Sequence, residues 1–320
     1  MTSFVPQHRL GDPSFDKWLS DAVQTFWCSG LDRGAASRNL VSVQEHLTTP
    51  DSWCWGVEES CGLGMAILAP CAWETSVIGQ SVAKVVFLAA DSYNIALTLA
   101  GEVRHHALKQ HMAFVGAAPG CSPAYVVYAL EHTGFHLVAQ YYLWVAKTSD
   151  VITTARKLAQ WYPLRFATPA DATAVASIAE EAFVYGRYLA DPCLPKEVGK
   201  RLYHEWAANS CRGYADVVIV YESNNEVVGF VTGKLEPPGQ TAWVDLVAVR
   251  DQERSRGVGV ALLAQLFLWC AEQGVESIRI DPQKPNIEIN RIYRHFGFNI
   301  EDSGLVLHWC PNASHGIYAS

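Results

Sequence analysis

No apolar run in this 320-residue sequence is long enough to cross a bilayer. The longest runs, such as residues 82–90, have the length of buried strands, so neither a transmembrane segment nor a membrane partner is expected. The nine cysteines include no CxxC pair, and neither end carries a charged-then-apolar leader. Both absences favour free thiols and a cytoplasmic location.

Charge is also scarce, since 18% of residues are charged and the net charge is −8. This balance argues against a nucleic-acid-binding surface and against disorder. The histidines form no HxxxH motif with a partner carboxylate, so no metal is expected. Half of the residues are hydrophobic, and the length suffices for two domains that each bury a core.

Hydrophobic periodicity predicts an α/β chain whose pattern of elements occurs twice. Helices are expected in the first half at residues 14–27, 93–111 and 123–132, with strands at 53–57, 63–68, 83–89, 113–117 and up to residue 145. After a partly helical connection, strands are expected at 165–167, 217–221, 227–235 and 243–249, and helices at 171–182, 198–208 and 260–271. Asn224-Asn225 predicts a hairpin turn.

Five pairs of positions, each about 160 residues apart, suggest an internal repeat, although each pair alone is common enough to arise by chance. The pairs are Arg9 with Arg165, Gly64 with Gly229, Asp91 with Asp251, Ala96 with Ala261, and His132-Thr-Gly134-Phe135 with His295-Phe-Gly297-Phe298.

The segment between the predicted central strand and its helix differs between the two copies. In the second copy, Val244–Gly259 ends a strand at Val249 and places Arg254, Arg256, Gly257 and Gly259 before a helix. Backbone amides and a helix N-terminus in this arrangement can bind an anion. The first copy has only residues 91–95 there, with neither Gly nor Arg, and cannot wrap a pyrophosphate.

Arg254-x-x-Gly257-x-Gly259, followed by Asn286, Tyr293 and Gly297-Phe298, resembles the acyl-CoA-binding motifs of the GNAT superfamily of N-acyltransferases. The resemblance implies two tandem GNAT-like domains of α/β (α+β) class, each with a mixed, mostly antiparallel sheet flanked by helices. In the second domain the central strand would be splayed. We expect a degenerate domain without a CoA loop at residues 1–147, a linker at 148–163, and an acyl-CoA-binding catalytic domain at 164–320.

The implied co-substrate is acetyl-CoA or another acyl-CoA. Its pyrophosphate would bind the loop amides, and its pantetheine would pair with the open strand edge. The residues concerned are Leu246, Val247, Ala248, Val249, Arg254, Ser255, Arg256, Gly257, Val258, Gly259, Val260 and Asn286. Two alternatives are a solvated charged turn and a Rossmann turn, although the GxGxxG that the latter requires is incomplete.

Tyr293 would protonate the departing thiolate, a role implied by the resemblance and open to a phenol. It could instead be a core tyrosine. Asn286 could orient the cofactor, cap the Tyr293 helix, or do both. Many relatives carry a Glu where this chain has Trp243, so the general base could be Asp245, His308 or solvent.

The acceptor amine would be bound by Phe183, Arg187, Tyr203 and Trp206, which lie in the acceptor segment of the superfamily. This region is similar to nucleotide-sugar amine acetyltransferases such as TDP-fucosamine acetyltransferase. Aromatic rings and an Arg could stack a base or a sugar and hold a phosphate. Tyr203 and Trp206 at helical spacing could equally be core residues.

The expected function is acetyl transfer from acetyl-CoA to a primary amine of a small molecule, possibly an amino sugar or a nucleotide-linked amino sugar. Alternatives are a tandem GNAT enzyme of mycothiol-synthase type, one acting on aminoglycosides or peptide N-termini, and an acyl-CoA-binding module without turnover. We expect a monomer or homodimer.

Overall fold

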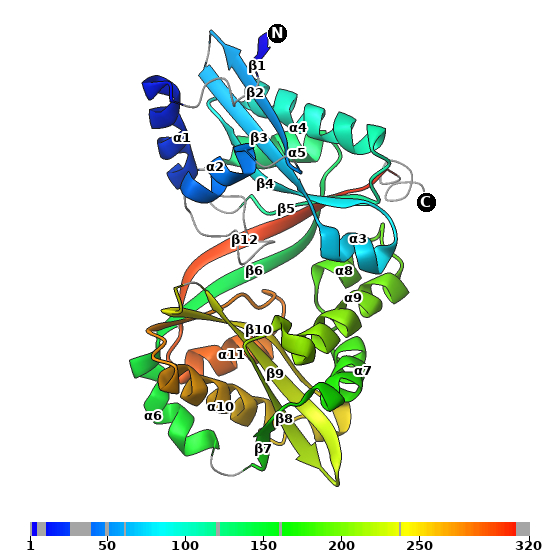
Figure 1. The fold of residues 1–320 in the computed structure, drawn as a ribbon, viewed down its shortest axis with the longest axis vertical. Helices are drawn as coiled ribbons and strands as arrows, with labels where there is room; N and C mark the ends of the chain where they lie inside the picture. The colour runs from blue at the N-terminus through cyan, green and yellow to red at the C-terminus, as the bar shows by residue number, and fades with distance from the viewer. Residues whose placement is uncertain are drawn as a thin grey trace. The chain divides into compact units, whose positions relative to one another are not determined.

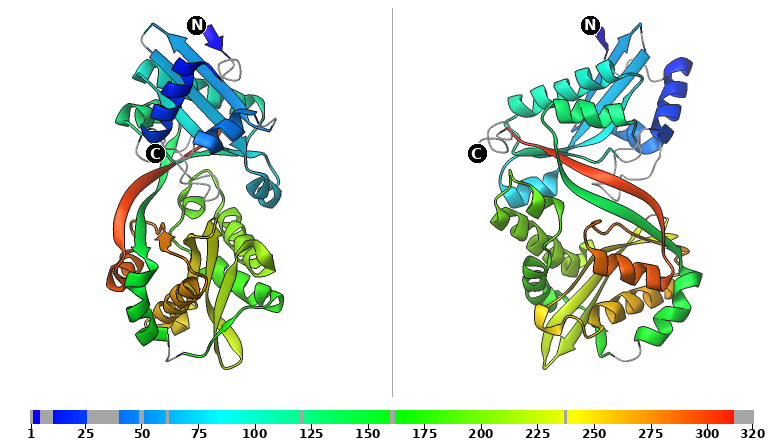
Figure 2. Two further views of the ribbon diagram at one scale, coloured as in Figure 1. Left: turned by 60° about the vertical axis from the view of Figure 1, so that its left-hand side comes forward. Right: turned by 180° about the vertical axis from the view of Figure 1, so that it is seen from behind.

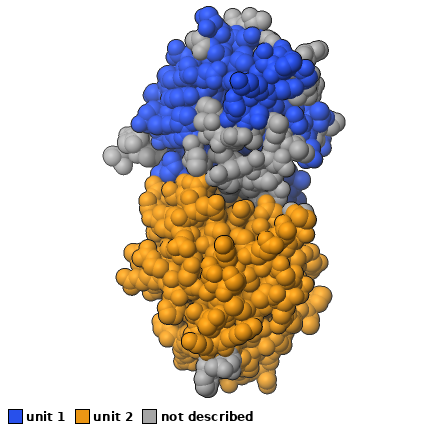
Figure 3. Space-filling model, turned by 90° about the vertical axis from the view of Figure 1, so that its left-hand side faces the viewer, with its two compact units in different colours: residues 1–139, 304–320 blue, residues 140–303 orange. Residues whose placement is uncertain are grey.

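A computed structural model describes residues 2–4, 11–25, 40–48, 51–60, 62–119, 122–159, 162–236 and 238–311 (Figure 1). The chain divides into two compact units (Figure 3). Unit 1 contains residues 1–139 and 304–320, and unit 2 contains residues 140–303. Arg9, one of the proposed repeat positions, and the last two residues of the predicted first helix lie outside the described residues.

Unit 1 contains a mixed sheet in the order β1-β2-β3-β4-β5-β12, in which only the β4–β5 pair is parallel. Its strands are β1 (Thr2–Phe4), β2 (Trp53–Glu59), β3 (Gly62–Pro70), β4 (Val82–Ala90), β5 (Phe114–Ala117) and the end of β12 (Asn299–Trp309). Its helices are α1 (Pro13–Thr25), α2 (Leu40–Thr48), α3 (Ala72–Ile78), α4 (Tyr93–Lys109) and α5 (Ala124–His132).

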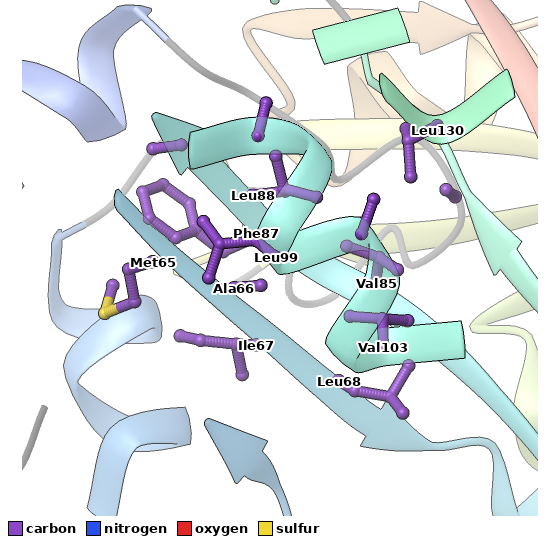
Figure 4. Close-up of a cluster of buried hydrophobic side chains, with 14 of the residues drawn as sticks. Met65, Ala66, Ile67, Leu68, Val85, Phe87, Leu88, Leu99, Val103 and Leu130 are labelled. Carbon is purple, nitrogen blue, oxygen red and sulfur yellow. The ribbon is translucent and has the colours of Figure 1, made fainter. Parts of the chain in front are cut away.

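The core of unit 1 lies between β3, β4 and the helices α4 and α5. Figure 4 shows Ala66 and Leu68 of β3 beside Leu99 and Val103 of α4, with Ile67 on the opposite side of the strand. All five side chains are fully buried. Because both faces of these strands are covered, β3 and β4 are apolar runs rather than alternating ones.

Unit 2 repeats this plan with a sheet in the order β6-β11-β10-β9-β8-β7, in which only the β10–β11 pair is parallel. Its strands are the end of β6 (His136–Lys147), β7 (Leu164–Phe166), β8 (Val217–Ser223), β9 (Glu226–Glu236), β10 (Thr241–Val249) and β11 (Ser277–Ile280). Its helices are α6 (Thr148–Ala159), α7 (Ala172–Ala182), α8 (Arg187–Ala190), α9 (Lys196–Asn209), α10 (Val258–Glu272) and α11 (Ile287–Phe296).

In unit 2, α7 and α9 pack together and α7 contacts β9 and β10, whereas α6 packs on α10 (Figure 2). The predicted hairpin turn is present between β8 and β9. Asn224 and Asn225 have φ values of 53° and 62°, the left-handed pair that a two-residue type I′ turn requires. The predicted α/β fold, with mixed and mostly antiparallel strand pairing flanked by helices, is confirmed.

The internal repeat is visible in how one glycine in each unit lets a helix approach the sheet. A Cβ added at Gly64 would lie 2.2 Å from Ile95 of α4, and one at Gly229 would lie 3.2 Å from Leu262 of α10. Both glycines sit opposite the last residue of the adjacent strand, Ala90 and Val249 respectively. The two copies therefore share the same contact between strand and helix.

The compact units differ from the predicted domain boundaries at two places. The predicted linker, residues 148–163, is largely α6, which belongs to unit 2 and buries Val151 and Ala155 against α10. The last strands are exchanged between the halves. The end of β6 pairs with β11 of the second half, and the end of β12 pairs with β5 of the first. Strand pairing between distant segments leaves no mark on local periodicity.

Cys193 and Cys310 are disulfide-bonded, so the expectation that all cysteines are free thiols is wrong. Four other described cysteines, Cys54, Cys71, Cys211 and Cys270, are thiols that form no disulfide. Burial raises the pKa of the Cys270 thiol to about 12, which keeps it protonated and unreactive. Within the described residues, the helices are too short or too polar to span a bilayer.

A salt bridge joins β7 to the start of α7. Arg165 donates to both carboxylate oxygens of Asp171 at 2.9 Å, and the Thr168 amide donates to Asp171 Oδ2 at 2.7 Å. The Arg165 guanidinium holds the pKa of this carboxyl well below its usual range. The stabilisation is therefore present above the pKa of the unfolded chain and lost as the pH falls.

We expect Asp171→Asn to destabilise the protein by about 1 kcal/mol at pH 7, because the bidentate charge-assisted pair with Arg165 is lost while asparagine can still cap the helix. The difference should shrink below about pH 4, where the unfolded Asp171 takes up its proton first. Urea unfolding of the wild type and of Asp171→Asn at pH 7 and pH 3 measures this difference in the free energy of unfolding. Equal differences at the two pH values would contradict it.

Candidate active site

The central strand of unit 2 separates from its parallel neighbour halfway along its length. Pairing between β10 and β11 covers Thr241–Val244, and β10 then continues to Val249 beside β9 alone. A register shift falls between Val244 and Val247, where the Leu246 amide donates to the Thr232 hydroxyl at 3.0 Å. The splay predicted for this strand is confirmed, and it leaves a backbone edge that an extended ligand can pair with.

The loop after β10 leads directly into the N-terminus of α10. A short 3₁₀ turn covers Asp251–Glu253, and Ser255 and Gly257 then adopt positive φ values of 63° and 80°. The first bond of the helix runs from the Ala261 amide to the Gly257 carbonyl. The amides of residues 258–260 therefore have no acceptor within the helix, and Gly257 has no side chain that could cap them. Such an N-terminus is suited to an anion.

The two loop arginines are placed differently. Arg254 turns back onto the protein. Its guanidinium donates to the carbonyls of Val249 at 3.1 Å and Ala182 at 3.4 Å, and pairs with Asp251 at 2.9 Å. Arg256 pairs with Glu253 at 3.0 Å, and its side chain is 66% exposed. Arg254 therefore holds the end of β10 to the end of α7, whereas Arg256 is the more accessible cation.

The two loop glycines also differ. A Cβ on Gly257 would lie 2.5 Å from the Tyr162 hydroxyl, whereas a Cβ on Gly259 would make only ordinary contact with Val249 at 3.7 Å. The surrounding protein therefore demands glycine at position 257. At position 259 the protein leaves room for a side chain, and the glycine there allows a ligand to approach the backbone closely. Val258 is buried in the core, and Val260 is partly buried at its edge.

Asn286 and Tyr293 lie on α11, at its start and in its last turns. Asn286 Oδ1 accepts from the Ile289 amide at 3.3 Å, so the capping role predicted for it is present. Tyr293 is 2% exposed, and its ring centroid lies 5.9 Å from that of Phe298. It is a member of the unit 2 core.

Of the two side chains considered as a general base, only Asp245 lies in unit 2. It is half-buried on β10, next to the register shift. His308 belongs to unit 1, where it is fully buried opposite Gly116 and stacks on Phe114 with ring centroids 4.9 Å apart. The structure therefore does not bring His308 into the unit 2 site, because β12 ends in the sheet of unit 1.

The predicted acceptor residues gather at α7, α8 and α9. Tyr203 stacks between Phe183 at 4.7 Å and Trp206 at 6.3 Å, and its own side chain is 8% exposed. Arg187 donates to the Tyr188 hydroxyl at 2.7 Å, and its guanidinium lies 4.4 Å from the centre of that ring. Tyr203 thus serves the core, whereas Phe183 and Trp206 are half-buried at its margin.

Two contacts of the site were not anticipated from the sequence. The Tyr162 hydroxyl donates to the Arg256 carbonyl at 2.5 Å, and the Thr232 hydroxyl accepts from the Leu246 amide at the register shift of β10. Neither residue lies near the loop in sequence, and no motif marks them. A threonine within the apolar β9 strand is the one signal that could have indicated a buried hydrogen bond.

Residues 183–298 match the acetyltransferase (GNAT) family, a segment that runs from the acceptor residues to the end of α11. The class defined by this match and the splayed-strand fold is N-acetyltransferase. Members of the GNAT family, which this segment matches, use acetyl-CoA as co-substrate.

Two relatives match most of the chain. The spore coat polysaccharide biosynthesis protein SpsD of Bacillus subtilis (strain 168) is 25% identical over 300 residues, 88% of this chain and 96% of that protein. A tandem GNAT protein from the clavulanic acid biosynthesis pathway has a TM-score of 0.52 at 15% identity, covering 91% of this chain and 93% of that one. This structural likeness shows the tandem fold.

A third relative matches only part of the chain. The L-2,4-diaminobutyric acid acetyltransferase of Nocardia farcinica (strain IFM 10152) is 38% identical over 78 residues, 23% of this chain and 40% of that protein.

Proposed function

We propose that unit 2 binds acetyl-CoA and transfers its acetyl group to a primary amine of a small molecule. One observation carries this proposal: the uncapped N-terminus of α10 follows the splayed edge of β10, with one short loop between them. The pyrophosphate of CoA suits the amides of residues 258–260, and pantetheine suits the open edge from Leu246 to Val249. Arg256 can add a charge-assisted contact to the phosphates.

The first half lacks the uncapped helix N-terminus at the corresponding position, which supports a non-catalytic role for unit 1. The N-terminus of α4 is capped by its own sequence, since Ser92 accepts from the Ile95 amide at 3.4 Å. At the end of α5, the Phe135 amide donates to Leu130, as the Phe298 amide donates to Tyr293. Leu130 therefore occupies the place of Tyr293 and offers no proton.

In the proposed reaction the neutral amine attacks the thioester carbonyl and a C–N bond forms. The oxyanion is stabilised by a strand amide near Val249. The C–S bond then breaks, Tyr293 donates its proton to the thiolate, and the nitrogen loses one proton to Asp245 or to water. Free CoA and an N-acetyl amide leave, and Tyr293 recovers its proton from solvent. Asn286 holds the start of the Tyr293 helix through its cap.

For the acceptor we propose an amino sugar, free or nucleotide-linked, bound against the exposed margins of Phe183 and Trp206 with Arg187 near its phosphate. The polysaccharide-biosynthesis relative supports a sugar, whereas the diaminobutyric acid acetyltransferase favours an amino acid side chain as the competing acceptor. Mycothiol-type, aminoglycoside and peptide acceptors remain alternatives within the same chemistry. We propose a cytoplasmic location, although the disulfide-bonded Cys193 and Cys310 do not favour it.

A thiol-release assay tests the proposal. Wild-type protein with acetyl-CoA is offered amino sugars, nucleotide-linked amino sugars, diaminobutyric acid and short peptides, and free CoA is measured. We expect release that depends on an amino sugar. Activity restricted to diaminobutyric acid or peptides would overturn the sugar assignment. Binding of acetyl-CoA without release under every amine would identify an acyl-CoA-binding module that does not turn over.

A further inference from the structure

Tyr162 lies outside the segment that matches the GNAT family, yet its hydroxyl reaches the cofactor loop. It stands shortly before β7, and its hydroxyl donates to the Arg256 carbonyl at 2.5 Å. Its ring packs edge-on against Tyr221 of β8, with ring centroids 5.9 Å apart. The ring is therefore held by the sheet while its hydroxyl binds the loop.

The hydrogen bond fixes the orientation of one peptide group. In a trans peptide the carbonyl and the following N–H point in opposite directions. Binding of the Arg256 carbonyl by Tyr162 therefore directs the Gly257 N–H to the other side of the loop. Ser255 and Gly257 on either side of this peptide both adopt left-handed φ values, which are sparsely populated. Without the hydrogen bond from Tyr162, the segment could therefore adopt other backbone conformations.

The contact also explains why position 257 is glycine. A Cβ there would lie 2.5 Å from the Tyr162 hydroxyl oxygen but 3.5 Å from the ring carbon that carries it. The conflict is thus with the hydroxyl alone. The two residues are matched to one another as well as to the backbone conformation.

We infer that Tyr162 is a positioning residue for the cofactor: it preorients the loop peptide at Arg256–Gly257 for the pyrophosphate of acyl-CoA. The inference rests on the proposed function of unit 2. Tyr162 touches neither the thioester nor the amine. It acts through the loop, and its effect belongs to cofactor affinity.

Tyr162→Phe should raise the KM for acetyl-CoA about five- to tenfold, the effect of one lost hydrogen bond, while kcat changes less than about twofold. Tyr221→Phe is the matched control, because it removes a phenol from the neighbouring ring and leaves the loop contact intact. A lower melting temperature with an unchanged KM would assign Tyr162 a structural role and overturn the inference.

Acetyl-pantetheine, which carries the thioester but no pyrophosphate, separates the loop from the rest of the site. The ratio of kcat/KM between wild type and Tyr162→Phe should be about five to ten with acetyl-CoA and close to one with acetyl-pantetheine. Equal losses with both donors would overturn the inference. Wild-type protein that releases no thiol from acetyl-CoA would instead overturn the proposed function, and the inference with it.

A double variant tests the match between the two residues. Gly257→Ala should weaken acetyl-CoA binding more in wild type than in the Tyr162→Phe background, because the second variant removes the atom that the new methyl would strike. Dissociation constants for acetyl-CoA from calorimetry give the comparison. Strictly additive losses would show that the hydroxyl and the glycine do not interact.

Discussion

A fragment of residues 140–303 is expected to fold cooperatively, whereas a fragment of residues 164–320 is expected to remain unfolded. The shorter fragment of the second half lacks α6 and the end of β6, which contribute Trp144, Val151 and Ala155 to the unit 2 core. It also carries the end of β12 without β5, so Leu307 and Trp309 lose the core in which they are buried.

The expected effect is large compared with the net stability of a domain. Each large apolar side chain that loses its buried position costs about 2 kcal/mol, and a domain has only about 5–15 kcal/mol in total. Urea unfolding followed by circular dichroism distinguishes the fragments. A sigmoidal transition for residues 164–320 would show that α6 and β6 are dispensable. Residues 140–320 serve as the control for the effect of the unpaired β12 end alone.

Tyr293→Phe is expected to lower kcat about 100-fold or more, the usual loss when a positioned general acid is removed. KM for acetyl-CoA should change little, and the alkaline limb of the kcat–pH profile should move or disappear. The phenyl ring keeps the packing against Phe298. The structure alone leaves a core role open, because the side chain is 2% exposed.

Steady-state kinetics between about pH 6 and about pH 11 tests the assignment, since that interval brackets the ordinary phenol pKa of about 10. Tyr221→Phe, a tyrosine of unit 2 outside the proposed chemistry, is the matched control. An unchanged kcat together with a lower melting temperature would make Tyr293 a core residue. The proton of the leaving thiol would then come from solvent.

Much of the fold could be predicted because its signals are local. The hairpin turn at Asn224-Asn225, the apolar strands and the amphipathic helices each follow from neighbouring residues. The same holds for the loop before α10, whose glycines and arginines are close in sequence. Residues brought together by long-range pairing could not be predicted. Tyr162, Thr232 and the exchanged strands β6 and β12 leave no pattern in any window of the sequence.

Side-chain direction was the other limit of prediction. Arg254 and Arg256 are two residues apart, and the sequence predicts that both bind the cofactor. In the structure, however, the Arg254 guanidinium donates to the carbonyls of Val249 and Ala182. His308 and Asp245 were both candidates for the base, although β12 ends in unit 1. Sequence spacing fixes which residues lie in a loop or strand, whereas the backbone conformation decides where each points.

The exchange of β6 and β12 reverses the usual order in which a chain completes its domains during synthesis. N-terminal domains ordinarily fold first, while the rest of the chain is still being made. Here the sheet of unit 1 lacks an edge until Leu307 and its neighbours have left the ribosome, whereas unit 2 is continuous and ends at residue 303. The half that begins the chain is thus the half that is finished last.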